Sequence, residues 1–337
     1  MDKIYFTKLL QKNIDKKIIP KNKKILITGA NGFIGKYLVY ALANVFHKNK
    51  NMIYGIDINQ NLNKTKNYKY FRKDLTKLKK NQIPKIKYDY VIHLAGIPSP
   101  VYYKKFPLKT IYLNAELSRE LLEISKKNKS KFIYFSSSEI YGNPSKENIP
   151  TKEIYNGNVS SIGDRSCYDE SKRMGETYTY IYKNNFNLDA KIIRPFNFYG
   201  DLMKSNDERI IPKFFYQSLN KKKITIYSNG QQTRTYCHII DATIMIILAI
   251  FKGKKFVYNI GNPNEEINAE KIANKIKKIT NQKLNLIKIP YPNNYPSDEP
   301  RRRCPSIKNF SSEFKFKPMV SLDKGLRMFY NYAKKNY

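Results

Sequence analysis

Short apolar runs alternate with amphipathic stretches through the first 200 residues. The run KILIT at residues 24–28 predicts a buried strand, and a glycine-rich turn and the helical pattern KYLVYALANVF follow it directly. Further apolar runs predict strands at residues 51–57, 88–96, 131–142 and 188–200, and helical periodicity marks residues 108–127 and 168–184. This alternation favours an α/β fold with a doubly wound, largely parallel sheet.

The pattern changes after residue 200, where the predicted elements become shorter and mixed. KITIYSN and KFVYNIGN predict strands, and helices are predicted through DATIMIILAIFKG, AEKIANKIKKIT and DKGLRMFYNYAKK. We therefore expect a smaller C-terminal α+β lobe. The predicted organisation is an N-terminal extension at residues 1–22, the sheet domain at 23–200 and the lobe at 201–337, with interleaved contributions to each.

The N-terminal extension places Ile4, Leu9, Leu10 and Ile14 on one face of a short predicted helix, which we expect to pack on the main domain. Neither this segment nor the run IMIILAI has the roughly 20 apolar residues that span a bilayer. We therefore predict a buried helix at IMIILAI and no membrane attachment.

The composition is strongly basic, with 63 Lys and Arg against 27 Asp and Glu and a formal net charge of +36. The lysines are spread over helical and loop stretches alike, which favours a solvated basic surface over a nucleic-acid site. Such a field would still speed the approach of an anionic substrate. The three cysteines are far apart and form no metal-ligand pattern, so we predict no metal site and a cytoplasmic location.

The turn GANGFIG is the first candidate site. Gly29, Gly32 and Gly35 allow a tight turn and a close approach of a pyrophosphate to the N-terminus of the next helix. Asp57 follows 22 residues after Gly35 at a predicted strand end, where a carboxylate accepts the ribose hydroxyls of NAD. The pattern predicts an NAD site, although Lys36 leaves NADP open.

Tyr168 and Lys172 form a Tyr-x-x-x-Lys pair at the start of a predicted helix. Chance also supplies such pairs in a chain with 28 tyrosines, and a second lies at Tyr330 and Lys334. On a helix the two side chains share a face, and a nearby lysine should lower the tyrosine pKa and favour proton abstraction from a hydroxyl. Only the first pair follows a predicted sheet strand, so we select it as catalytic.

The strand before this pair ends in FSSSE. The hydroxyls of Ser136, Ser137 and Ser138 can hydrogen-bond a reacting oxygen, and Glu139 is a carboxylate suited to acid/base work. Because the carboxyl ends of parallel strands meet at one edge, we expect these residues to share a crevice with the glycine turn and Tyr168.

Taken together, these motifs make the chain resemble the extended short-chain dehydrogenase/reductases that act on nucleotide sugars, over residues 24–328. Within them it is most similar to the UDP-glucuronate decarboxylases (UDP-xylose synthases). The resembling segments are AGIPSPVYYKKFPLKT (95–110), SSSEIYGNP (136–144), YNGNVSSIGDRSCYDESKR (155–173), RPFNFYG (194–200), GQQTRTYCHIIDA (230–242), NIGNP (259–263) and DEPRRRCPSI (298–307).

The resemblance implies a Rossmann NAD-binding domain, a nucleotide-sugar lobe, a homodimer and specific site residues. The implied catalytic residues are Tyr168, Lys172, Ser137, Ser138, Glu139 and Arg303. The implied cofactor contacts are Gly29, Asn31, Gly32, Phe33, Ile34, Gly35, Asp57, Asp74, Leu75, Leu94, Ala95, Gly96, Tyr168 and Lys172. The implied substrate contacts are Asn197, Arg209, Tyr227, Arg234 and Arg303.

The implied reaction is NAD-dependent decarboxylation of UDP-glucuronate to UDP-xylose through a transient 4-keto sugar. A 4,6-dehydratase and a 4-epimerase use the same intermediate and remain alternatives. A common deoxysugar type of dehydratase has an Asp-Glu dyad where this chain has Ser138 and Glu139, whereas dehydratases of GDP-mannose also carry Ser-Glu. A non-catalytic NAD- or RNA-binding protein is the alternative of another class.

Overall fold

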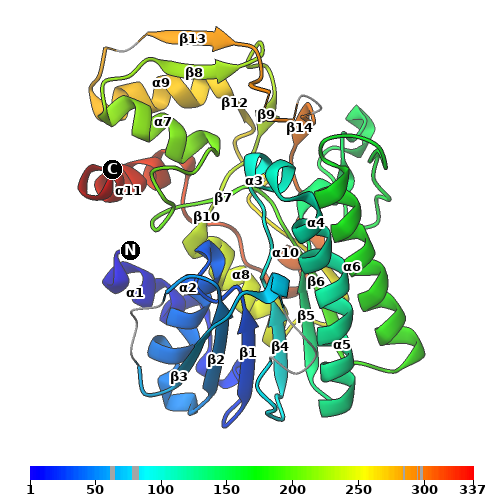
Figure 1. Ribbon diagram of the computed structural model, residues 1–337. Helices are drawn as coiled ribbons and strands as arrows, with labels where there is room; N and C mark the ends of the chain where they lie inside the picture. The colour runs from blue at the N-terminus through cyan, green and yellow to red at the C-terminus, as the bar shows by residue number, and fades with distance from the viewer. Residues whose placement is uncertain (61–64, 78–82, 284, 294, 297–298) are drawn as a thin grey trace.

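The computed structural model describes residues 1–60, 65–77, 83–283, 285–293, 295–296 and 299–337 (Figure 1). Within these residues a seven-stranded sheet has the order β11-β6-β5-β4-β1-β2-β3, and every neighbouring pair is parallel. Its strands are β1 (Lys24–Thr28), β2 (Met52–Asp57), β3 (Tyr68–Arg72), β4 (Tyr90–His93), β5 (Lys131–Phe135), β6 (Ala190–Pro195) and β11 (Val257–Ile260). The predicted doubly wound α/β fold is confirmed.

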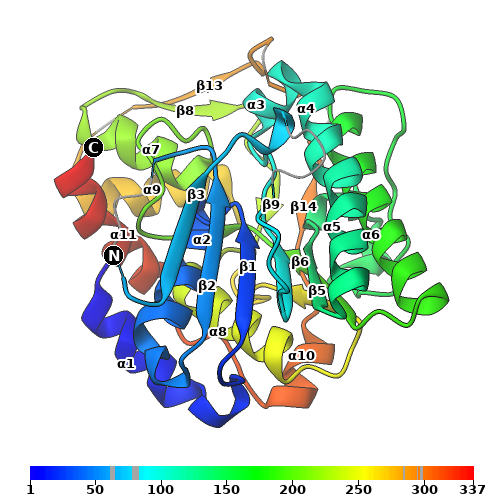
Figure 2. The same ribbon diagram turned by 60° about the horizontal axis from the view of Figure 1, so that its bottom comes forward.

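Helices cover both faces of this sheet, which explains why its strands are apolar on both sides. Alternate strand residues face two different cores: Ile25 and Ile27 lie in one, and Leu26 lies in the other. Figure 2 shows the two helical layers on either side of the strands. One layer holds α1 (Lys3–Asn13), α2 (Phe33–Tyr40), α8 (Ile239–Phe251) and α10 (Lys308–Phe314); the other holds α5 (Leu117–Asn128) and α6 (Ser166–Asn185).

A third core lies in the smaller lobe, beyond one end of the sheet (Figure 1). There α7, α9 and α11 pack with a short parallel pair, β8 and β13, and a further small sheet has the order β12-β9-β14. The bounds are α7 (Ile210–Leu219), β8 (Ile224–Tyr227), β9 (Thr233–Arg234), β12 (Ile267–Asn268), α9 (Ala269–Thr280), β13 (Leu286–Ile289), β14 (Arg302–Arg303) and α11 (Leu322–Asn336). The remaining elements are α3 (Pro100–Lys105), α4 (Pro107–Ile111), β7 (Phe198–Tyr199) and β10 (Cys237–His238).

One local prediction from the sequence is wrong, and a second is only partly right. The elements α8 and β11 were assigned to the smaller lobe, but β11 pairs with β6 in the large sheet and α8 packs in the core beneath it. The cause is that residues 239–250 of α8 are all buried, so this helix needs apolar partners on every side. The predicted face of α1 packs on the core through Leu9 and Leu10, and Ile14 just after the helix is buried as well, but Ile4 is 72% exposed and Phe6 is buried.

The carboxyl ends of β1, β2, β4, β5 and β6 lie at the same edge of the sheet because these strands are parallel. The smaller lobe stands over this edge (Figure 1). Crevices at the carboxyl ends of strands are the usual ligand sites of open α/β sheets. Among the described residues, no helix combines the length and the apolar character needed to cross a bilayer.

Candidate active site

Two cavities adjoin at the edge where the strands end. The larger, of about 620 Å³, follows the sheet edge, and the smaller, of about 220 Å³, lies between the sheet and the smaller lobe. Five residues line both cavities: Pro98, Glu139, Asn197, Phe198 and Arg209. The two spaces therefore meet at Glu139, one of the residues selected from the sequence.

The glycine turn shapes one end of the larger cavity. Gly29 has a φ of +69°, and a Cβ there would lie 2.7 Å from the backbone nitrogen of Ala95. A Cβ on Gly35 would overlap the carbonyl oxygen of Gly29 and lie 2.7 Å from that of Ala30. Gly32 caps α2 without a side-chain hydrogen bond, so the first N–H groups of the helix remain for a ligand.

Asp57 ends β2 and lines the larger cavity with 7% of its surface exposed. Its Oδ2 accepts a hydrogen bond from the backbone N–H of Asn31 at 3.0 Å, and its Oδ1 accepts one from that of Asn59 at 2.9 Å. Asn31 is not among the residues that line the cavity, and its backbone N–H holds Asp57 in place; its contact with the cofactor stays a prediction.

The other predicted cofactor contacts all line the larger cavity: Gly29, Gly32, Phe33, Ile34, Gly35, Asp57, Asp74, Leu75, Leu94, Ala95, Gly96, Tyr168 and Lys172. Its volume is within the roughly 300–1,000 Å³ typical of ligand pockets. The glycine cradle, the N-terminus of α2 and the buried Asp57 carboxylate fit a dinucleotide.

Tyr168 and Lys172 lie on α6, and each is only 5% exposed. Tyr168 stacks on Tyr103, with ring centroids 5.1 Å apart. Lys172 Nζ donates a hydrogen bond to the carbonyl oxygen of Phe135 at 2.8 Å. Burial lowers the pKa of Lys172 to about 7, although the carboxylate of Glu176 opposes this shift. The amino group of Lys172 is thus anchored at the end of β5.

The predicted lowering of the Tyr168 pKa by Lys172 is wrong in this structure. Burial raises the pKa of Tyr168, and the main opposing influence is a hydrogen bond with Ser137. Lys172 Nζ lies 5.9 Å from the centroid of the Tyr168 ring, and its hydrogen bond goes to the backbone instead. Within the described structure, Ser137 is therefore the main group that favours the phenolate, and Arg165 acts in the same direction.

The second Tyr-x-x-x-Lys pair, Tyr330 and Lys334, lies on α11 in the smaller lobe. Lys334 is exposed, and neither residue lines the two cavities. The selection of Tyr168 and Lys172 by their position after a strand therefore agrees with the geometry.

The serine cluster follows β5 directly at the cavity wall. Strand β5 ends at Phe135, so the predicted strand over residues 131–142 is shorter than expected. Ser136, Ser137 and Ser138 line the larger cavity, and Ser137 Oγ accepts a hydrogen bond from the backbone N–H of Glu139 at 3.3 Å. This cap turns the chain so that Glu139 reaches both cavities.

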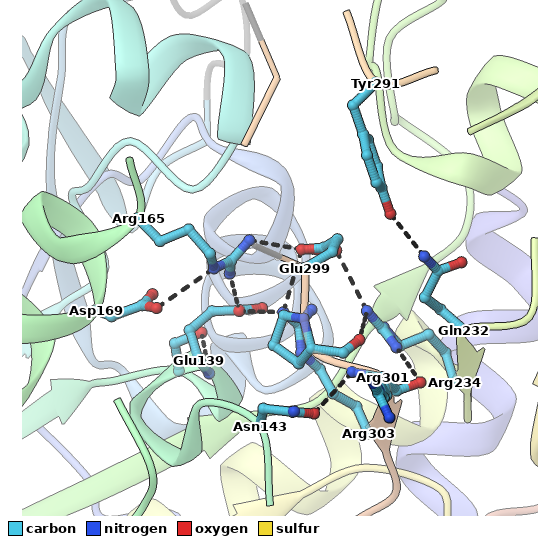
Figure 3. Close-up of polar contacts among 12 residues, drawn as sticks. Glu139, Asn143, Arg165, Asp169, Gln232, Arg234, Tyr291, Glu299, Arg301 and Arg303 are labelled. Carbon is cyan, nitrogen blue, oxygen red and sulfur yellow. Dashed lines mark hydrogen bonds and ion pairs between the residues drawn. The ribbon is translucent and has the colours of Figure 1, made fainter. Parts of the chain in front are cut away.

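Glu139 is held by two arginines (Figure 3). Its Oε2 accepts hydrogen bonds from Nη2 of Arg165, just before α6, and from Nη2 of Arg303, on β14. Both guanidiniums are buried, with 4% and 7% of the residue surface exposed. Charge-assisted bonds of this kind fix both distance and direction. The sheet edge and the smaller lobe are therefore joined at a carboxylate between the two cavities.

A second carboxylate, Glu299, extends this network toward Arg234 on β9. Its Oε2 accepts from Arg165 Nη1 at 2.6 Å, and its Oε1 accepts from Arg234 Nη2 at 3.3 Å. Burial alone would raise the pKa of Glu299, but Arg303, Arg165 and Arg234 hold it well below its usual range. We call the following six residues the charged cluster: Glu139, Arg165, Asp169, Arg234, Glu299 and Arg303.

Asp169 completes the charged cluster on α6. Arg165 Nε donates to its Oδ2 at 3.4 Å, and its Oδ1 is buried without a hydrogen-bond partner in the described structure. Burial and the neighbouring Glu139 raise the pKa of Asp169. The cluster is thus rich in charge and incompletely paired, which is typical of sites that bind charged ligands.

The predicted substrate contacts all line the smaller cavity: Asn197, Arg209, Tyr227, Arg234 and Arg303. The structure brings Arg165, Asp169 and Glu299 to the same place, and none of these was selected from the sequence. Glu299 lies four residues before Arg303 in DEPRRR. This acidic residue beside a run of arginines was the one feature of the sequence that could have indicated its place in the site. Position 298, the first of that segment, lies outside the described residues.

The family model described as the NAD dependent epimerase/dehydratase family matches residues 25–261. The chain belongs to this family. It is 34% identical over 316 residues to UDP-glucuronic acid decarboxylase 3 of Arabidopsis thaliana, covering 92% of this chain and 89% of that protein. It is 31% identical over 308 residues to UDP-glucuronic acid decarboxylase 1 of Danio rerio, covering 90% and 71%.

Solved structures show the same fold. The UDP-glucuronic acid 4-epimerase from Bacillus cereus in complex with UDP-glucuronic acid and NAD is 28% identical, with a TM-score of 0.76 over 93% of this chain and 100% of that one. The dTDP-glucose 4,6-dehydratase from Bacillus anthracis has 23% identity and a TM-score of 0.76, covering 93% and 97%. The family resemblance and the NAD-dependent enzyme class predicted from the sequence are confirmed.

Proposed function

We propose that the protein decarboxylates UDP-glucuronate to UDP-xylose. The observation that carries this proposal is the pairing of Glu139 with Arg165 and Arg303 at the junction of the two cavities. Guanidiniums at the reacting end of a sugar site suit a sugar carboxylate and the enolate that its loss would leave. The UDP-glucuronic acid decarboxylases that this chain resembles support the same reaction.

The first step depends on Tyr168. The glycine turn, the N-terminus of α2 and Asp57 would hold NAD, which would supply reversible hydride transfer at C4 of the sugar. The phenolate of Tyr168, which the hydrogen bond with Ser137 favours, takes the proton of the C4 hydroxyl as that carbon becomes a ketone. The buried Lys172, fixed to the Phe135 carbonyl, places a donor beside the cofactor cavity.

The second step uses the sugar carboxylate, which is β to the new ketone. The bond between C5 and the carboxyl carbon breaks, CO₂ leaves, and the bonding electrons pass to the ketone as an enolate. Arg303 stabilises the negative charge, and Glu139 relays to C5 a proton that it takes from solvent. Tyr168 then returns its proton to the C4 oxygen as the hydride returns to C4, so no other redox substrate is needed.

The nucleotide end of the substrate is assigned to the rest of the smaller cavity. Asn197, Arg209, Tyr227 and Arg234 are proposed to hold the uracil, ribose and diphosphate. An arginine fork suits a diphosphate because it donates two parallel charged hydrogen bonds. Arg234 is 8% exposed and lines the cavity, so its interaction with an anion would be weakly screened.

One alternative has a specific observation behind it. The solved UDP-glucuronic acid 4-epimerase from Bacillus cereus is 28% identical over most of this chain, and 4-epimerisation starts from the same ketone. Incubation with UDP-, GDP-, dTDP- and CDP-sugars, followed by product mass, separates the reactions. Loss of CO₂ from UDP-glucuronate supports the proposal, a new product of unchanged mass that separates from the substrate on chromatography indicates epimerisation, and loss of water indicates dehydration.

A homodimer and a cytoplasmic location also belong to the proposal. On α6, Met174 and Tyr180 are 47% and 58% exposed, and Leu108 on α4 is 79% exposed, which supports association through this face. Light scattering of the purified protein measures the oligomeric state. A monomer mass at micromolar concentration would refute the dimer.

The proposed cytoplasmic location is supported by the cysteines. Cys167, Cys237 and Cys304 are free, which is compatible with a reducing compartment.

A further inference from the structure

Glu299 occupies the position where the charged cluster would meet a substrate anion. One carboxylate bridges three buried guanidiniums: Oε2 lies 2.6 Å from Arg165 Nη1 and 3.6 Å from Arg303 Nη2, and Oε1 lies 3.3 Å from Arg234 Nη2. All four residues line the smaller cavity. Figure 3 shows Glu299 between the arginines rather than at the outside of the cluster.

Carboxyl groups of the protein already face the guanidiniums of the cluster. Within the described residues it contains three guanidiniums, from Arg165, Arg234 and Arg303, and three carboxylic acids, from Glu139, Asp169 and Glu299. A further carboxylate placed among them would face Glu299 in a poorly screened site, where like charges repel strongly. An incoming anion therefore competes with a carboxylate of the protein for these guanidiniums.

Glu299 is the carboxylate best placed for this exchange. Glu139 is less suited because the backbone hydrogen bond to Ser137 fixes it at the junction of the two cavities. Asp169 is less suited because, among the described arginines, it contacts only Arg165. Glu299 contacts all three guanidiniums with its two oxygens, and Arg303 Nε is still buried without a hydrogen-bond partner in the described structure. That guanidinium has a donor left for a ligand.

We propose that Glu299 is a specificity-determining residue that competes, as an internal counter-ion, with the carboxylate of the sugar for Arg165 and Arg303. This inference rests on the proposed function of the same cavity. The competition lowers the affinity for an anionic sugar and eases its release, while a sugar without a carboxylate does not need to displace Glu299 at that end. The residue therefore sets the ratio of affinities between charged and neutral UDP-sugars.

The test compares two ligands that differ only at C6. Calorimetry is done on NAD-loaded protein that carries Tyr168→Phe, so that UDP-glucuronate is not consumed during the titration. It measures the Kd of UDP-glucuronate and of UDP-glucose with Glu299 present and with Glu299→Gln, which removes the charge but keeps the shape. We expect the substitution to tighten UDP-glucuronate by about tenfold and to change UDP-glucose by less than about threefold. Equal shifts for both ligands, or weaker binding of UDP-glucuronate, would overturn the proposal.

Two further variants make the result independent of folding problems. Glu299→Asp keeps the charge but withdraws it by one methylene group. Its ratio of affinities for UDP-glucuronate and UDP-glucose should therefore fall between the ratios with Glu299 and with Glu299→Gln. If Glu299→Gln does not fold, an unchanged ratio in Glu299→Asp would overturn the proposal. Glu266→Gln is the matched control. Glu266 pairs with Arg302, which lies on β14 beside Arg303, but Glu266 lines neither of the two site cavities. Its ratio should equal that of the wild type.

These binding data are separable from the reaction itself. If wild-type protein binds UDP-glucuronate but releases no CO₂, the decarboxylase proposal fails while the Kd ratio still tests Glu299. If CO₂ is released and the ratio does not respond to Glu299→Gln, the proposed function stands and the role of Glu299 is refuted.

Discussion

Lys172 should make the folded protein less stable than an apolar side chain would, although the proposed reaction needs it. Burial lowers its pKa from 10.5 to about 7, which corresponds to about 5 kcal/mol of unfavourable free energy for the charged form. At pH 7.5 most of this cost, about 4 kcal/mol, is felt, because the unfolded lysine is protonated and the folded one is largely not. We therefore predict that Lys172→Met abolishes turnover and stabilises the fold.

The gain is reduced by a lost hydrogen bond. Lys172 Nζ donates to the Phe135 carbonyl, and leaving that acceptor unpaired costs about 1–3 kcal/mol. The net stabilisation at pH 7.5 should then be about 1–3 kcal/mol. A folded pKa below the unfolded one means that the wild type becomes more stable as pH rises from 7 toward 10.5. Between pH 7.5 and 9.5 the advantage of the variant should fall by about 2–3 kcal/mol.

Denaturation by urea at pH 7.5 and 9.5, on protein freed of nucleotide, measures both quantities. Lys21→Met is the control, because Lys21 is exposed and should give the same stability difference at both pH values. A difference between wild type and Lys172→Met that does not change with pH would show that Lys172 is not neutralised by burial. The reasoning from its buried position would then be refuted.

Three further predictions test the rest of the site. Tyr168→Phe should lower kcat by about 10²–10⁴ with little change in the Kd of the UDP-sugar, measured by steady-state kinetics and calorimetry. Gly35→Ala should lower the free energy of unfolding by about 1–3 kcal/mol and should also lower the NAD content after purification, because the added Cβ would overlap the Gly29 carbonyl oxygen. Gly32→Ala is the control, because its Cβ would lie 3.1 Å from the same oxygen, and it should lower the free energy of unfolding by less. Equal losses of stability in the two variants would contradict the steric argument. Asp57→Ala should narrow the preference for NAD over NADP in a cofactor-binding assay, and an unchanged preference would count against Asp57 as the ribose ligand.

Strands β1, β2, β4, β5 and β6 could be predicted because each lies in an apolar run, whereas the edge strand β3, YKYFR, has no such run and no buried residue. The rule that parallel strands share a carboxyl edge then predicts that Gly29, Asp57, Ser137 and Tyr168 lie together. The π-helical turn at Tyr112–Glu116, which separates α4 from α5, could not be read from the continuous helical period of residues 108–127.

The charged cluster could not be predicted from local sequence patterns. Arg165, Arg234 and Glu299 are 65 or more residues apart along the chain, and only the docking of the smaller lobe on the sheet edge makes them neighbours. Likewise, the spacing of Tyr168 and Lys172 showed a shared helix face but not where Nζ would point. Its bond to the Phe135 carbonyl depends on how α6 packs against β5.

The central claim is that the carboxyl group of UDP-glucuronate leaves as CO₂, and mass spectrometry of the reaction product tests it most directly. Incubation of the NAD-loaded protein with UDP-glucuronate should yield a product lighter by the mass of CO₂, and Tyr168→Phe under the same conditions should yield almost none. A product of unchanged mass with inverted C4, or one lighter by water, would contradict the claim.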